Sequence, residues 1–188
     1  MRRARVSKSQ AEQAILERFA DAYYRHFGAE LSDISYRDRP DFAAVDSFTL
    51  QTLGIEVTGV YQDEREAEIN YWIDGEWGII IGNLDGLVSN INRALIDKAE
   101  KAKGYEEIGP FVLAIWIGSF IYNYMSDIKY IAPLLLIPDN PFSLIALVIT
   151  DDFDRLPALY VLQELTSWRH NELTQKKIAG AGRASLRE

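Results

Sequence analysis

A continuous apolar run at residues 110–120, PFVLAIWIGSF, limits the fold more than any other feature of the chain. A run without an alternating polar side predicts a strand that is buried on both faces of a sheet. Residues 143–151 and 158–165 are similarly apolar and predict two further strands. The apolar runs are all shorter than the roughly 18–20 residues of a membrane-spanning helix. We therefore expect a soluble protein with no membrane partner.

Two segments with helical periodicity are predicted to flank this sheet. The first covers residues 9–27, where Ser9 and Glu12 have the spacing of a capping box and Gly28 is a natural stop. Its apolar stripe consists of Ile15, Leu16, Phe19, Tyr23 and Phe27. The second helix covers residues 84–105.

The order of helix, strands, helix and further strands predicts an α/β or α+β domain with a central mixed sheet flanked by helices. We assign residues 1–170 to a single domain and residues 171–188 to a flexible basic tail. Residues 62–83 are interpreted as an excursion with one or two strands. Residues 131–138, IAPLLLIP, are interpreted as a buried strand or core segment.

Charge is distributed unevenly along the chain, whose formal net charge is −8. Residues 1–10 carry four cations and no acids, and residues 169–188 carry five cations and two acids, so the acids are concentrated between them. An acidic body disfavours strong non-specific binding to nucleic acid. It is compatible with metal-dependent chemistry, because carboxylates bind Mg²⁺. The absence of cysteine excludes thiolate metal sites and cysteine nucleophiles, and it is compatible with a cytoplasmic location.

A hairpin is predicted over residues 39–61, and its spacing sets Asp41 roughly opposite Glu56. Burying a carboxylate among the β-branched neighbours of Glu56 is costly unless its charge is compensated. Two adjacent carboxylates repel unless a cation lies between them, and Mg²⁺ accepts one or two carboxylates. We interpret Asp41 and Glu56 as candidate metal ligands. The alternative is a pair of edge-strand carboxylates in water or paired with Arg37 or Arg39.

Charged residues on the two helices extend this candidate site. On the second helix, Lys98 falls in the middle of the apolar face and Lys101 at its edge, whereas Lys103 points away. An inward-facing Lys98 could reach Asp41 and Glu56; the alternative for both lysines is a solvated head on a buried stem. On the first helix, Glu12 aligns with the apolar stripe, although it could simply close the capping box.

The motifs resemble a known superfamily. PDF at residues 40–42, GIEVT at 54–58 and the helix IDKAEKAKGY at 96–105 before an apolar strand are similar to divergent branches of the PD-(D/E)xK, restriction-endonuclease-like nucleases. The resemblance covers about residues 9–120. It implies a restriction-endonuclease-like core, with Mg²⁺ or Mn²⁺ held by Asp41 and Glu56 and with assistance from Glu12.

The resemblance departs from the usual pattern at Thr58, where the family has a lysine two residues after the glutamate. The catalytic lysine would then be Lys98 or Lys101. We therefore expect a metal-dependent nuclease that acts on DNA in preference to RNA, and a homodimer is compatible with the sequence. The alternatives are a degenerate nuclease-like fold that acts as a binding or interaction module, and an immunity protein suited by the acidic body.

Overall fold

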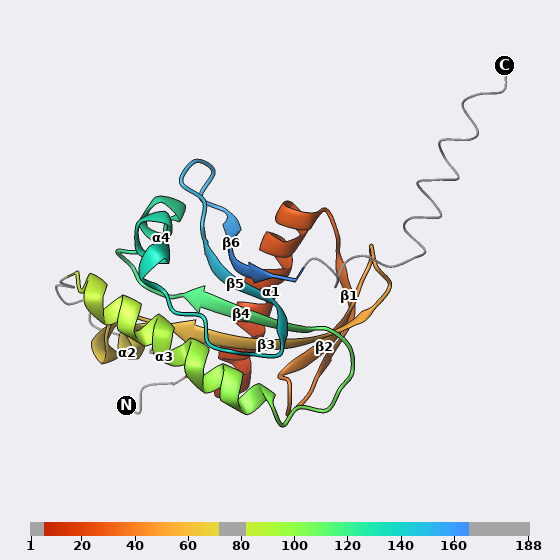
Figure 1. The fold of residues 1–188 in the computed structure, drawn as a ribbon. Helices are drawn as coiled ribbons and strands as arrows, with labels where there is room; N and C mark the ends of the chain where they lie inside the picture. Colours follow the sequence, from red (N-terminus) through yellow and green to blue (C-terminus); the bar gives the residue numbers. More distant parts are fainter. Residues whose placement is uncertain (1–5, 72–81, 166–188) are drawn as a thin grey trace, which may run out of the picture.

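The computed structural model describes residues 6–71 and 82–165. Six strands form one mixed sheet in sequence order: β1 (Leu31–Tyr36), β2 (Phe42–Asp46), β3 (Thr52–Val60), β4 (Phe111–Ile117), β5 (Phe142–Thr150) and β6 (Pro157–Glu164). The central strands β3, β4 and β5 are parallel, and the outer pairs are antiparallel. The helical elements are α1 (Lys8–Phe27), α2 (Glu64–Tyr71), α3 (Leu84–Ala102), α4 (Met125–Ile131) and the short 3₁₀ turn η1 (Ala132–Leu134). The described chain is thus an α/β fold with helices packed against a six-stranded sheet (Figure 1).

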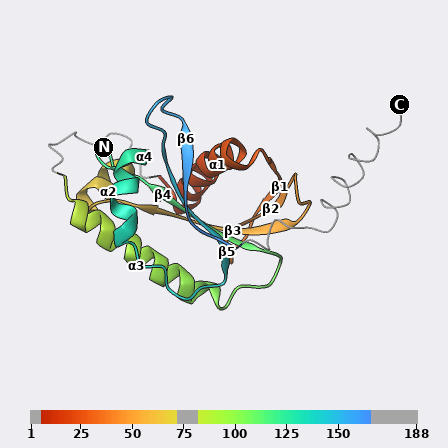
Figure 2. The ribbon, with the colours of Figure 1, turned by 45° about the horizontal axis from the view of Figure 1, so that its top comes forward.

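The helices cover the two faces of the sheet separately. Figure 2 shows α1 on one side, with α3 and α4 on the other. Alternating residues of β4 point to the two sides: Val112 and Ala114 pack in the cluster under α1, and Leu113 and Ile115 pack in the cluster under α3 and α4. The apolar run that predicted a doubly covered strand therefore does form one.

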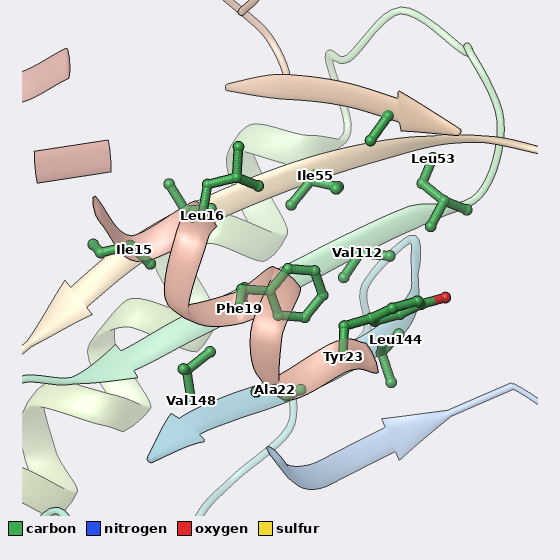
Figure 3. Packing of buried hydrophobic residues seen from close by; sticks show 14 of the residues in the cluster. Ile15, Leu16, Phe19, Ala22, Tyr23, Leu53, Ile55, Val112, Leu144 and Val148 are labelled. Carbon is green, nitrogen blue, oxygen red and sulfur yellow. The ribbon is translucent and has the colours of Figure 1, made fainter. Parts of the chain in front are cut away.

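The apolar stripe of α1 builds the first of these clusters. Leu16, Phe19 and Tyr23 lie over the sheet residues Ile55 and Val112 in Figure 3. The stripe was predicted from helical spacing, and Gly28 ends the helix in the left-handed conformation at φ 67°.

The start of α1 differs from the prediction. Ser7 is the N-cap residue and Gln10 completes the capping box, so the pairing expected for Ser9 and Glu12 is wrong. Several residues here have capping potential, and spacing alone does not select among them. The packing of the helix on the core selects the N-cap residue, because it determines at which residue the first turn begins.

Two segments were assigned wrongly from sequence. The part of residues 62–83 that the structure describes contains α2 rather than a strand; residues 72–81 lie outside the described part, as does the tail predicted at 171–188. Residues 131–138 form the end of α4, η1 and a loop, with Leu134 and Leu136 more than half exposed. Their backbone bonds to the side chain of Asn92 instead of to a strand.

In the described part of the chain, no helix is long and apolar enough to cross a membrane.

Candidate functional site

Asp41 and Glu56 lie next to each other where the β2–β3 hairpin opens. The ladder between the two strands ends at the pair of Phe42 and Ile55, so Asp41 and Glu56 occupy the following positions. Both carboxylates are buried, with 6 % and 4 % of the residue surface exposed. Asp41 Oδ2 accepts a hydrogen bond of 2.9 Å from the backbone N–H of Val57, which ties it to β3. The predicted register is confirmed.

The two arginines considered as partners of these acids bind elsewhere. Arg37 pairs with Glu106 at 2.6 Å, and Arg39 lies 3.9 Å from Asp38. Within residues 6–71 and 82–165, neither arginine pairs with Asp41 or Glu56. The alternative in which Asp41 and Glu56 are solvated or paired with these arginines is therefore wrong.

Lys98 reaches the site from α3. Its ammonium group forms an ion pair with Glu56 Oε1 and donates a hydrogen bond of 3.2 Å to the carbonyl of Val57. Its side chain is only 15 % exposed. Lys103 pairs instead with Glu100 at 2.7 Å on the exposed side of the helix. The helical phase that set these two lysines on different sides is confirmed, and the snorkelling alternative for Lys98 is wrong.

Tyr105 also lies beside Glu56, and it was not predicted as a site residue. Its pKa is raised well above the ordinary value, first by burial and then by a hydrogen bond to the Glu56 side chain. The ring packs edge-on against Phe111, with centroids 5.7 Å apart. Tyr105 lies just beyond α3, which ends at Ala102 rather than at the predicted residue 105, and a buried aromatic residue is usually a core anchor. The hydroxyl group is what distinguishes it.

Glu12 lies beside the site without touching the two acids. It is buried, forms an ion pair of 3.1 Å with Lys8, and accepts a hydrogen bond of 3.4 Å from the Tyr36 hydroxyl. It is close enough to contribute to raising the pKa of Asp41. The inward orientation predicted for Glu12 is confirmed, and its role as a cap is wrong.

Two hollows meet at the end of β3. Beyond the β2 ladder, this strand continues to Val60, and Thr58, Gly59 and Lys98 line both hollows. The α1 groove, of about 610 Å³, lies between this strand and the start of α1, with Lys8 and Glu12 in its wall. The α2–α3 cleft, of about 340 Å³, lies between the two helices for which we name it.

Lys101 belongs to the α2–α3 cleft and not to the carboxylate pair. It is exposed on α3, one turn after Lys98, and lines the cleft wall. No ion pair or hydrogen bond joins it to Asp41 or Glu56 in the described residues. Of the two lysines predicted for catalysis, the fold therefore brings Lys98 alone into contact with the acids.

The electrostatics of the acids are not balanced in this arrangement. Burial raises the pKa of Asp41 to about 6, and the neighbouring charge of Glu56 acts in the same direction. The N–H of Val57 and the ammonium group of Lys98 oppose this rise. One ammonium group therefore faces two buried carboxylates, so their negative charge is only partly compensated by Lys98.

The donor set fits a hard cation with few protein ligands. Among the described residues, no group of three or more His, Asp or Glu side chains is arranged to hold a metal by itself. Mg²⁺ is commonly bound by one or two carboxylates, with water and substrate phosphate in its other positions. Asp41 and Glu56 match that requirement in number and chemistry, and Val57 and Lys98, which contact them, line the α1 groove.

Comparisons with protein-family models, with curated proteins and with solved structures found no match to this chain.

Proposed function

We propose that the protein is a metal-dependent phosphodiesterase of nuclease type, a divergent member of the PD-(D/E)xK superfamily with a restriction-endonuclease-like core. The observation that carries the proposal is the buried pair of Asp41 and Glu56 beside Lys98, a lysine that also lines both hollows. An acidic pair and a lysine are the groups that metal-assisted phosphodiester hydrolysis requires.

The topology supports the same assignment. A helix precedes the antiparallel β2–β3 hairpin, and α3 leads into β4, which pairs in parallel with β3. The acids lie where the ladder between the hairpin strands ends, and beyond it β3 continues to Thr58 and Gly59, which line the α1 groove. This arrangement suits a ligand that enters from the side of the sheet.

Asp41 and Glu56 would hold Mg²⁺ or Mn²⁺. When bound, such an ion supplies an acidified water and offsets charge that develops on the phosphate. Holding both oxygens on adjacent strands fixes their separation without relying on loops.

Lys98 takes the part that a lysine after Glu56 has in the family. In the metal-free site its ammonium group is held by Glu56 and by the carbonyl of Val57. When Glu56 ligates a cation, the same ammonium group is positioned to orient the attacking water or to stabilise charge on the phosphate. Glu12, across the α1 groove from Lys98, can accept a hydrogen bond from that water.

Cleavage assays on single- and double-stranded DNA and RNA, with Mg²⁺ or Mn²⁺, test the proposal. Glu56→Gln should abolish metal-dependent cleavage while it keeps an acceptor for Lys98, and Lys98→Ala should reduce turnover by roughly 10²-fold or more. Lys103→Ala is the matched control, because Lys103 bonds to Glu100 on the exposed side of the helix. Wild-type protein that neither cleaves nor binds metal by calorimetry would contradict the proposal.

A catalytically degenerate interaction or immunity module is the second candidate. Thr58 favours it, because the usual lysine is missing and Lys98 forms an ion pair with the glutamate. Thr58→Lys separates the two candidates: it should crowd Lys98 in a working site and give little gain, whereas it should recover cleavage in a degenerate one.

A further inference from the structure

The α2–α3 cleft continues the candidate site along α3. It shares Thr58, Gly59 and Lys98 with the α1 groove, and Lys98 pairs with Glu56, so one lysine connects the cleft to the carboxylate pair. The α3 wall adds two cations, Arg93 and Lys101, and one acid, Asp97. Neither cation has a carboxylate within 4 Å in the part of the chain that the structure describes, although Asp97 lies one turn from each.

Arg93 is held in place by the fold. The Nδ2 of Asn90 donates a hydrogen bond of 2.8 Å to the carbonyl of Tyr61, which fixes the orientation of the Asn90 amide. The Oδ1 of this amide accepts a hydrogen bond of 2.8 Å from the guanidinium group of Arg93. One edge of the guanidinium is thus fixed by a neutral amide, and its charge and remaining donors are available to an anion.

The α2 wall of the cleft has a different chemistry. Asp63 and Glu64 line it, and Asp63 also accepts the backbone N–H of Glu66 at 2.8 Å. A ligand that carries only anionic groups would be repelled by this wall. A nucleotide suits both walls, because its phosphate can lie on Arg93 and Lys101 while amino groups of its base donate to carboxylates.

We propose that the α2–α3 cleft binds one nucleotide of a single-stranded nucleic acid, adjacent to the phosphate at the carboxylate pair. The phosphate lies on Arg93 and Lys101, and the base faces Asp63 and Glu64. The inference rests on the proposed function, whose substrate it specifies as a single strand.

The size of the cleft supports a strand over a duplex. Its volume of about 340 Å³ is at the small end of the range for small-molecule sites, roughly 300–1,000 Å³. A paired base is held in its stack, so only an unpaired nucleotide can enter such a cleft with its base turned to the protein. The assignment also gives Lys101 a role in binding phosphate rather than in catalysis.

Fluorescence anisotropy tests this with labelled oligo(dC), oligo(dT) and a duplex of equal length, in Ca²⁺ and at several salt concentrations. Arg93→Ala and Lys101→Ala should each weaken single-strand binding about three- to tenfold and lower the salt slope by about 0.7. Lys103→Ala, on the same helix but paired with Glu100, should change neither. Oligo(dC), which has an exocyclic amine, should bind more tightly than oligo(dT), and Glu64→Gln should reduce that difference.

The outcomes separate this inference from the proposed function. Cleavage by wild type with unchanged single-strand binding and unchanged KM in Arg93→Ala would overturn the inference and leave the nuclease standing. Arg93-dependent single-strand binding without any metal-dependent cleavage would support the cleft and overturn the nuclease. Tighter binding of the duplex than of either single strand would overturn the inference. Equal binding of oligo(dC) and oligo(dT) would overturn the proposed contact of the base with Asp63 and Glu64.

Discussion

Asp41 lies just before β2 and Asp46 is its last residue. Both are buried, but their carboxylates accept very different numbers of hydrogen bonds. Asp46 accepts hydrogen bonds from the Tyr23 hydroxyl and the Thr49 N–H, both at 2.6 Å, and also from the Thr49 hydroxyl and the Phe48 N–H. Among the described residues, the carboxylate of Asp41 accepts a hydrogen bond from the Val57 N–H alone. The carboxylate of Asp46 closes a turn, whereas the carboxylate of Asp41 has fewer donors.

Their pKa values follow this difference. Burial by itself would raise the pKa of Asp46, but the donors from Tyr23, Thr49 and Phe48 outweigh burial and lower it. Burial and Glu56 together raise the pKa of Asp41 to about 6. A buried acid with a full set of donors stabilises the fold, whereas a buried acid with too few donors is a candidate for ligand binding.

The largest expected effect is on stability at Asp46. Asp46→Ala should lower the free energy of unfolding by about 3 kcal/mol, because it leaves the Tyr23 hydroxyl and turn N–H groups buried without an acceptor. Chemical denaturation measures this. Asp38→Ala, at a side chain that is 98 % exposed, is the control and should change stability by less than about 0.5 kcal/mol. A loss below about 1 kcal/mol at Asp46 would remove the contrast between the two aspartates.

The pH dependence of stability should have opposite signs at the two positions. The folded pKa of Asp41, about 6, exceeds the ordinary 3.8, so its contribution to stability falls as pH rises between these values. In metal-free protein, Asp41→Asn should therefore become more stable than wild type by about 2 kcal/mol at neutral pH and about equal to it near pH 4. The contribution of Asp46, whose pKa is lowered, is present above about pH 4 and is lost as pH falls further. The free energy of unfolding, measured by denaturation at several pH values, checks this. A difference between wild type and Asp41→Asn that does not change with pH would contradict the prediction.

Metal should reverse the order of wild type and Asp41→Asn. At a Mn²⁺ concentration about ten times the wild-type Kd, wild type should gain about 1.4 kcal/mol of stability, and Asp41→Asn should gain almost none because a charged ligand is lost. Thermal unfolding with and without Mn²⁺ measures the gain. An equal gain in both proteins would mean that Asp41 is not a ligand.

The smallest effect is expected at Tyr105. Tyr105→Phe keeps the ring against Phe111 and removes only the hydroxyl group that binds Glu56. Partners that orient a metal ligand contribute to affinity, so Mn²⁺ affinity by calorimetry should fall by up to about tenfold. Stability should change by less than about 1 kcal/mol. Tyr130→Phe, at a residue that is 74 % exposed, controls for loss of a hydroxyl, and an effect as large there would show that Tyr105 has no special part.

Much of the site could be predicted because it follows local periodicity. The two-residue alternation of strands set Asp41 opposite Glu56 once the turn of the hairpin was located. The 3.6-residue period of α3 separated Lys98 from Lys103. Both deductions need only the geometry of one element or of two connected by a short turn.

Errors arose where a partner distant in sequence decided the outcome. Residues 131–138 are apolar enough for a strand, but Asn92 binds the backbone of Leu134 and Leu136, whose side chains are more than half exposed. Lys101 was predicted at the edge of the apolar face, near the acids, yet it lines the α2–α3 cleft. Phase gives a direction from the helix axis, and it does not give the distance to another element.

The sequence by itself determined the mixed sheet with covering helices, the register of the hairpin and the inward direction of Lys98, because hydrophobic periodicity and turn spacing are local. The tertiary structure alone decided that Lys98 and Tyr105 lie at Glu56, that Asn90 is held by the carbonyl of Tyr61, and that the Tyr23 hydroxyl binds Asp46 whereas the N–H of Val57 binds Asp41. Each of these depends on groups from separate elements brought within hydrogen-bonding distance, where burial sets the strength of every charge.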